Sequence, residues 1–341
     1  MLGFVSCVAV QAKDNPEIAK LAEGVYARIV SPDGNAVGNS GIIVLDRCVL
    51  VFDTHFTPEA GRSLLEAVRS ITPKPVRYVV NSHAHPDHTH GNQVFADAQI
   101  IGSTNARREV MQNDLPSLNR TLSIAQVQLE KLRQEMNGND ADASRRQQLR
   151  EQIQSREEYV RTMSHLKIMP PIITLDDSLL IQDGKQEIRI ANLGPGHTDG
   201  DIILFLPSSK ITFVGDLFFS EAIPNVQDAN ILQWMKTLEE LLTLDAEKFV
   251  PGHGKPGSKK DVAAFLAYFE ELKSLVQPAV DRGDSMDQAI KDVRAPSKYS
   301  AFRFQNFFPA NVQKMYAELK AQQIADASAE PPGKSKSKPA K

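Results

Sequence analysis

The sequence predicts an α/β fold made of two strand-rich halves joined by a helical segment. Short apolar runs typical of strands recur between residues 23 and 250, and helical patterns separate several of them. A long heptad stripe lies between the two halves. With 341 residues, 41% of them hydrophobic, the chain can bury a sizeable core.

Apolar runs in the first half predict strands, and a turn sequence separates the first two. Ser31-Pro32-Asp33-Gly34-Asn35 favours a turn, so the runs on either side of it predict a hairpin. Thr57 followed by Pro58 is typical of a helix start, and this helix should continue to about Ser70. The predicted strands cover residues 23–30, 40–45, 48–53, 76–80 and 99–102.

Residues 117–166 predict an antiparallel helical hairpin inserted into the chain. Apolar residues from Leu118 to Met136 recur at alternating spacings of four and three, which is a heptad stripe. Asn137-Gly138-Asn139-Asp140 interrupts the stripe, and a second apolar series follows from Leu149 to Met163. Three roles stay open for this hairpin: a self-packed decoration, a lid over a functional site, or a contact between two copies of the chain.

Strand-like runs resume after the hairpin, and helices follow them. Asp228 or Asn230 can cap a helix that carries Trp234, and Ser258 can cap the next helix. We expect residues 258–324 to form helices packed on the same domain. Residues 325–341 are rich in Ala, Ser, Pro and Lys and should be disordered. The predicted strands of this half cover residues 172–175, 178–182, 187–191, 201–206 and 211–214.

Five of the eight histidines lie in short motifs that follow predicted strands or glycine turns. These motifs are Ser82-His83-Ala84-His85-Pro86-Asp87-His88, Gly196-His197-Thr198, Gly215-Asp216 and Pro251-Gly252-His253-Gly254. Imidazole and carboxylate groups are preferred zinc ligands, and catalytic zinc sites keep one position open for water. From a loop after a strand, His83 and His85 can turn toward one point. The adjacent Asp87 and His88 diverge from that pair and can serve a second metal.

The motif His-x-His-x-Asp-His, followed in order by the other three, resembles the metallo-β-lactamase superfamily over roughly residues 20–257. The resemblance implies an αββα sandwich, with the hairpin 117–166 as an insertion, and a centre of two zinc ions. It implies that Asp53 orients a metal-ligating side chain through a hydrogen bond, as residues that contact metal ligands often do. The implied ligands are His83, His85 and His197 for the first metal, Asp87, His88 and His253 for the second, and Asp216 as the bridge.

The same resemblance implies a metal-dependent hydrolase. A hydroxide shared by two zinc ions attacks a carbonyl in such enzymes, with Asp87 and Asp216 as the catalytic carboxylates here. With an acidic residue at position 216, the implied ligand set resembles that of glyoxalase II, lactonases and esterase-like members. The substrate classes left open are β-lactams, lactones, esters and thioesters. Iron or manganese is the alternative to zinc, and an iron-dependent thiol or sulfur dioxygenase is the alternative activity. We expect His55, Phe219 and Asn225 to line the substrate pocket.

Bulk properties restrict the partners and the location. The net charge of −3 gives no basic footprint for nucleic acid, and no apolar run is long enough to span a membrane, so a small-molecule substrate is the expected partner. Residues 1–12 resemble the end of a truncated secretory signal, which predicts a periplasmic or secreted protein; without such a signal the protein would be cytoplasmic. Cys48 would remain a lone thiol, so no intrachain disulfide is expected.

Overall fold

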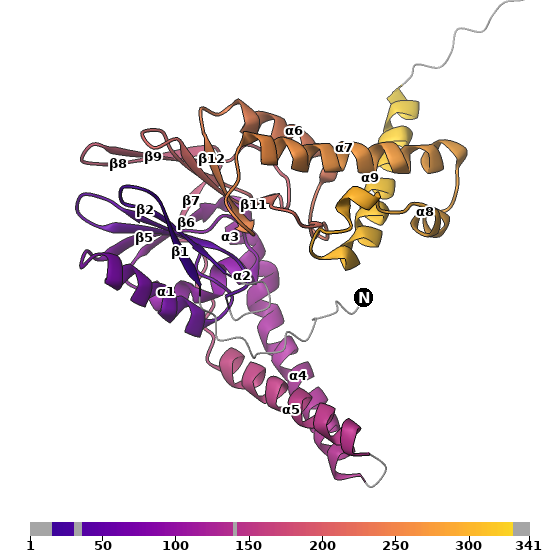
Figure 1. The fold of residues 1–341 in the computed structure, drawn as a ribbon, viewed down its shortest axis with the longest axis horizontal. Helices are drawn as coiled ribbons and strands as arrows, with labels where there is room; N and C mark the ends of the chain where they lie inside the picture. The colour runs from indigo at the N-terminus through magenta and orange to yellow at the C-terminus, as the bar shows by residue number, and fades with distance from the viewer. Residues whose placement is uncertain (1–15, 31–35, 139–141, 330–341) are drawn as a thin grey trace, which may run out of the picture.

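Two facing β-sheets, with helices on both outer faces, form the body of the molecule (Figure 1). The computed structural model describes residues 16–30, 36–138 and 142–329. The two sheets and the helices on their outer faces confirm the predicted αββα sandwich. The predicted secretory signal, residues 1–12, lies outside the described residues, as does the predicted turn at residues 31–35.

The first sheet has seven strands in sequence order, and its last four are mutually parallel. The edge strand at residues 17–22 was not predicted, because most of its side chains are exposed or half-buried and give no apolar signal. It pairs antiparallel with its neighbour across a turn at Gly24. The strands are β1 (Glu17–Ala22), β2 (Val25–Ile29), β3 (Ser40–Val44), β4 (Val49–Phe52), β5 (Val76–Val80), β6 (Gln99–Ser103) and β7 (Ile173–Leu175).

The second sheet has five strands in the order β12-β11-β10-β9-β8. They are β8 (Ser178–Asp183), β9 (Gln186–Ala191), β10 (Ile203–Leu206), β11 (Ile211–Phe219) and β12 (Lys248–His253). β11 is longer than the predicted strand 211–214, because it continues through Gly215 and Asp216 with a shift of register against β12. The shift is a local bulge, and such bulges redirect a side chain. β11 and β12 run parallel, so their carboxyl ends reach the same edge of the sandwich.

The core between the sheets is apolar and fully buried. Phe52 from the first sheet meets Phe213 from the second, with ring centroids 5.6 Å apart. Ile190 and Leu204 of the second sheet belong to the same cluster. Cys48 lies at its margin as a buried free thiol, as expected of a lone cysteine.

Helices cover the outer face of each sheet. On the first sheet, α1 (Pro58–Ile71) begins at its cap Thr57 and buries Leu64 and Val68. On the second sheet, Asn230 caps α6 (Ile231–Thr243), and Ser258 caps α7 (Lys259–Arg282). Further helices are α2 (Pro86–Thr89), α3 (Thr104–Glu109), α8 (Met286–Asp292) and α9 (Phe308–Ala329).

The C-terminal helices pack on the second sheet through one apolar cluster shared by α6, α7 and α9. Glu318 of α9 also accepts hydrogen bonds from the backbone N–H groups of Ile231 and Leu232, at the start of α6. α9 extends to Ala329, into the stretch 325–341 that the composition predicted to be disordered, because alanine-rich residues before the prolines still favour helix. Residues 330–341 lie outside the described residues.

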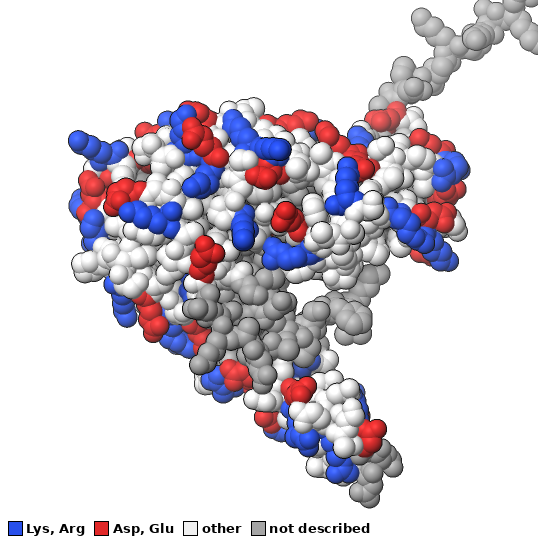
Figure 2. Space-filling view, in the orientation of Figure 1, with Lys and Arg blue, Asp and Glu red and all other residues white. Residues whose placement is uncertain are grey.

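The predicted hairpin is formed by α4 (Leu115–Asn137) and α5 (Ala143–Ser164), which project from the sandwich (Figure 1). Few of its side chains are buried, among them Leu129 and Leu149. Both signs of charge alternate along it in Figure 2, and Arg133 pairs with Glu157 at 2.7 Å. Among the described helices, none combines the length and the apolar character that crossing a bilayer requires.

Candidate metal centre

All seven predicted ligands lie at one edge of the sandwich, where parallel strands from both sheets end. The loop after β5 carries His83 and His85, and its continuation into α2 carries Asp87 and His88. The second sheet supplies the others: His197 from the loop between β9 and β10, Asp216 from within β11, and His253 from the end of β12. Residues far apart in sequence therefore meet because the two sheets face each other.

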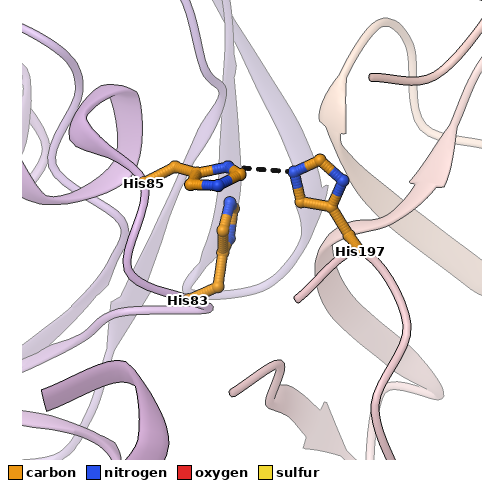
Figure 3. A group of neighbouring side chains, drawn as sticks. All are labelled: His83, His85 and His197. Carbon is orange, nitrogen blue, oxygen red and sulfur yellow. Dashed lines mark hydrogen bonds between the residues drawn. The ribbon is translucent and has the colours of Figure 1, made fainter. Parts of the chain in front are cut away.

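The first group is His83, His85 and His197, which offer one nitrogen each within 4.8 Å of one another. Figure 3 shows the three rings facing a common point, with His197 approaching from the side opposite His83 and His85. Nε2 of His197 lies 3.0 Å from Nδ1 of His85. The rings of His83 and His197 meet edge to face, with centroids 5.0 Å apart. This arrangement offers three nitrogen donors to one cation.

The second group is Asp87, His88 and His253, which offer one carboxylate oxygen and two ring nitrogens within 4.8 Å of one another. Asp216 lies between the groups: its Oδ1 is 3.3 Å from Nε2 of His88, and its Oδ2 is 3.3 Å from Nε2 of His253. Oδ2 is also 3.4 Å from Nε2 of His197 in the first group. One carboxylate thus contacts both groups, which is what a bridging ligand requires.

Three atoms that point into this cluster are buried with no hydrogen-bond partner in the described structure. They are Nε2 of His83, Nε2 of His88 and Oδ1 of Asp216, and the last two lie 3.3 Å apart without forming a hydrogen bond. A buried polar atom without a partner costs about 1–3 kcal/mol, so three of them in one place need an explanation. Nitrogen and carboxylate donors of this kind fit a divalent cation of the zinc type. The residues present therefore fit the metal that the motifs imply.

The electrostatics of the two groups differ. Burial and the neighbouring His88 and His85 hold the pKa of His83 well below its ordinary value, and burial lowers the pKa of His197 to about 3. Burial also acts on His253, but the carboxylates of Asp216 and Asp87 outweigh it and raise that pKa to about 9. His83 and His197 are thus neutral without a metal, whereas neighbouring carboxylates outweigh burial and raise the pKa of His85, His88 and His253, whose protons metal binding must release.

Asp53 supports the second group from beneath. It follows β4 in a left-handed conformation with φ of 56°, which is uncommon for a residue other than glycine. Its carboxylate accepts hydrogen bonds from the backbone N–H and the hydroxyl of Ser82, both at 2.7 Å. Its Oδ2 also lies 2.8 Å from Nδ1 of His88. This contact leaves Nε2 of His88 directed at Asp87 and Asp216.

Asp228 makes the equivalent contact to the first group, which the sequence analysis missed. Its Oδ2 lies 3.0 Å from Nε2 of His85, so Nδ1 of that ring faces His197. The sequence offered Asp228 and Asn230 as alternative helix caps, and Asn230 is the cap in the structure. No local pattern distinguishes an aspartate that reaches 143 positions back along the chain, so only the fold could identify it.

A buried amide network, also missed, fixes the loop that carries the first motif. Asn81 and Asn92 exchange two side-chain hydrogen bonds, at 3.1 and 2.9 Å. Thr54 donates to Asn92 at 2.8 Å, and Asn81 donates to the backbone carbonyl of His88 at 3.2 Å. The network ties the ends of β4 and β5 together beneath the ligands.

Two of the motif glycines are required by close approach. A Cβ at Gly252 would lie 1.8 Å from Oδ1 of Asp216. At Gly215 a Cβ would lie 2.5 Å from the Ser82 side chain, and φ there is 54°. Glycine is therefore needed beside the Asp216 carboxylate on both strands.

A cavity of about 190 Å³ opens onto the metal cluster. Of the three residues expected to line a substrate pocket, Phe219 and Asn225 line this cavity and His55 does not. The His55 ring is fully buried beside Arg28 and Ser40, and its Nδ1 is 2.7 Å from the carbonyl oxygen of Gly38. The described residues of α4 and α5 contribute nothing to the lining. The lining is Val37, His85, Asp87, His197, Asp216, Phe219, Asn225, His253, Phe304 and Phe307.

Comparison with known proteins places these features in a family context. A family model described as the metallo-beta-lactamase superfamily matches residues 33–253. Among solved structures, a metallo-beta-lactamase from Pontibacter korlensis has a TM-score of 0.54 at 16% sequence identity. The match covers 75% of this chain and 99% of that one. A likeness at this identity concerns the fold alone.

Two curated relatives align over most of the chain. A linear primary-alkylsulfatase from Pseudomonas sp. is 19% identical over 271 residues, which are 74% of this chain and 49% of the relative. The alpha subunit of a 2,4-dinitroanisole O-demethylase from Nocardioides sp. is 24% identical over 278 residues, which are 78% of this chain and 70% of the relative. The chain thus spans about half the length of the alkylsulfatase that it matches.

Proposed function

The chain belongs to the metallo-β-lactamase superfamily, and on that basis we propose that it is a hydrolase that uses two zinc ions to cleave a carbonyl compound. The first ion would be held by His83, His85 and His197, and the second by Asp87, His88 and His253. The observation that carries the proposal is the position of Asp216, whose two oxygens lie within 3.4 Å of nitrogens from both groups. The substrates considered are esters, thioesters, lactones and β-lactams.

The chain's own residues supply the positioning that such a reaction needs. Zinc at this centre would supply Lewis acidity and a water molecule of lowered pKa. Asp53 and Asp228 fix the ring orientation of His88 and His85, respectively, so that the other nitrogen of each ring faces the centre. Oδ1 of Asn225 accepts a hydrogen bond from the backbone of Gln227 at 3.1 Å, which leaves its amide NH₂ to donate to an oxyanion in the cavity.

The test is turnover by zinc-loaded protein whose metal content has been measured. The panel contains a chromogenic cephalosporin, p-nitrophenyl esters, a lactone, a thioester and, because one relative is named an alkylsulfatase, a long-chain alkyl sulfate. We expect turnover of at least one carbonyl substrate that a chelator abolishes and zinc restores. Protein that holds two zinc ions but cleaves none of the carbonyl substrates would overturn the proposal.

The metal itself is tested in the same preparation. Iron, rather than zinc, together with oxygen consumption in the presence of a persulfide, would favour the dioxygenase alternative. Zinc with no oxygen consumption supports the hydrolase. Manganese in place of zinc would keep the hydrolase and correct only the identity of the ion.

We also propose that the hairpin of α4 and α5 pairs two copies of this chain. Ile124 and Val127 are 42% and 56% exposed, and a spacing of three places them on one face of α4. The hairpin projects from the sandwich (Figure 1) and its described residues contribute nothing to the cavity lining, so two copies can meet through it along a two-fold axis. Sedimentation of the wild type should show a dimer, and Val127→Glu combined with Ile124→Glu should show a monomer. A monomeric wild type contradicts the pairing.

A further inference from the structure

The cavity at the metal centre has two chemically different sides. Ligand side chains form one side, including His85 and His197. Two phenylalanines from the C-terminal part of the chain, Phe304 and Phe307, form the other side, whereas Phe219 packs against the ligand ring of His253, with centroids 5.4 Å apart. A polar side with a centre of reaction and an apolar side together resemble a site that binds a substrate's reactive group and its apolar group separately.

We propose that Phe304 and Phe307 form an apolar subsite that binds an alkyl or aryl group of the substrate beside the scissile bond. The inference rests on the proposed hydrolase function and adds the substrate's chemical class. Both rings are only half-buried although they are large and apolar, and their centroids are 5.9 Å apart. Covering them with an apolar group removes that surface from water, which favours binding.

The segment that carries these rings is held firmly in place. The backbone N–H of Arg303 donates to the carbonyl of Glu221 at 3.0 Å, and the N–H of Ile223 donates to the carbonyl of Arg303 at 2.9 Å. These two bonds fasten the segment to the loop that follows β11 and carries Asn225. The Arg303 guanidinium lies 5.6 Å from the Phe304 ring centroid, over the ring. The apolar side is therefore attached to the same strand that delivers Asp216.

Phe304 itself adopts a backbone conformation that costs free energy. Its φ is 61°, in the left-handed region, and Glu221 on the opposing segment has φ of 52°. Such conformations are strained, persist only where the surroundings enforce them, and cluster at ligand sites. Here Gln305 enforces the turn by donating to the carbonyls of Tyr299 and Phe302, at 2.6 and 2.8 Å. The residue with the strained backbone is therefore one whose side chain lines the cavity.

Direct binding tests the subsite without requiring turnover. The probes are straight-chain carboxylates from acetate to octanoate, titrated calorimetrically into zinc-loaded protein. Each carboxylate can reach the metal side, so affinity differences along the series report the contact of the chain. We expect affinity to rise about fourfold per added methylene until the cavity is filled. An affinity that does not change with chain length in the wild type would overturn the proposal.

Variants assign the effect to particular rings. Phe304→Ala and Phe307→Ala should reduce the dependence on chain length, and Phe304→Leu and Phe307→Leu should retain part of it and serve if the alanine variants fold poorly. The matched control is Phe302→Ala, because Phe302 lies in the same segment but packs against Tyr299 and does not line the cavity. The control should keep the full dependence. Equal loss in the control and in the two cavity variants would contradict a specific subsite.

Hydrolysis separates this inference from the function on which it rests. On p-nitrophenyl esters of increasing acyl length, the wild type should gain in kcat/KM along the series, by about tenfold or more between acetate and hexanoate. The cavity variants should lose this gain, whereas the control Phe302→Ala should keep it. Chain-dependent binding by protein that holds two zinc ions but cleaves none of the carbonyl substrates would overturn the proposed function and leave the subsite standing. Ester cleavage without chain dependence would do the reverse.

Discussion

Charged groups are placed differently in two regions: the end of the sandwich that carries the candidate ligands from His83 to His253 (the metal end) and the helical hairpin of α4 and α5. At the metal end, charged groups are buried and paired: Asp53 and His88 are 1% and 0% exposed, and their contact is 2.8 Å. In the hairpin, Arg133 and Glu157 make a contact of 2.7 Å with both side chains 48% exposed. The distances are nearly the same, but water screens only the second pair. Burial rather than contact distance therefore decides which contacts matter for function.

The difference extends to the backbone. Near the candidate ligands, a Cβ at Gly252 or Gly215 would clash with a neighbouring side chain. Asp53 has a left-handed backbone conformation. In the hairpin, Gly138 ends α4 with an ordinary φ of −71°, and a Cβ there would meet nothing closer than 3.3 Å. We therefore expect a Cβ to disturb the structure at Gly252 or Gly215 and to be tolerated at Gly138.

The largest effect should follow from Asp216→Ala. Removal of the carboxylate that contacts both groups should weaken binding of both ions and lower kcat/KM by more than about 100-fold, which is the upper range for loss of an outer partner of a ligand. Asp199→Ala is the matched control, because Asp199 is exposed and pairs only with Arg108 at the surface. Metal content and turnover are measured together. Full activity with two ions in Asp216→Ala would remove the bridging role.

Gly252→Ala compares the two regions directly. Its Cβ would lie 1.8 Å from Oδ1 of Asp216, so the carboxylate must move or β12 must shift. We expect lower zinc affinity, lower turnover and a lower Tm. Gly138→Ala, the same substitution in the hairpin, should keep activity. Equal behaviour of the two variants, measured by zinc titration and thermal unfolding, would break the comparison.

Asp53→Asn tests the buried pair at the metal end. The variant keeps the shape of the side chain but removes the charge that orients His88, and such partners are worth about 10–100-fold in metal affinity or activity. The same substitution at Asp97, an exposed residue at the end of the loop, is the control. A zinc competition assay measures the change. Unaltered affinity in Asp53→Asn would show that the ring of His88 needs no support.

The sequence predicted those features that depend on residues close together in the chain. Strand ends, helix caps such as Thr57 and Ser258, and the glycine-flanked ligands follow from spacing and residue type. The contact of Asp228 with His85 and the cavity positions of Phe304 and Phe307 depend on segments that meet only after folding. His55 was wrong as a pocket residue for the same reason. Its place next to the motif gave no sign that Arg28 and Gly38 enclose it.

His55 predicts how acid affects stability. Burial and the nearby Arg28 lower its pKa from 6.5 to about 3 in the folded chain. Between these values the unfolded chain binds a proton that the folded chain does not, so stability is full above pH 6.5 and falls as the pH drops toward 3. One such proton gives a slope of about 1.4 kcal/mol per pH unit. His55→Gln should flatten this slope in urea unfolding at pH 5 and pH 7, and His165→Gln, at an exposed position, should not. An unchanged slope in His55→Gln would refute its role.

The smallest effect should come from Arg133→Ala in the hairpin. This change removes one partner of an ion pair that is 0.1 Å shorter than the contact at Asp53 (2.7 against 2.8 Å), but exposed pairs contribute about 0–1 kcal/mol because water and salt screen them. We expect the free energy of unfolding to fall by less than about 1 kcal/mol, with substrate preference across the panel unchanged. The described residues of the hairpin do not line the cavity, so a change in preference would restore a lid role for α4 and α5. Measured beside Asp53→Asn, this variant compares an exposed ion pair with a buried contact at nearly the same distance.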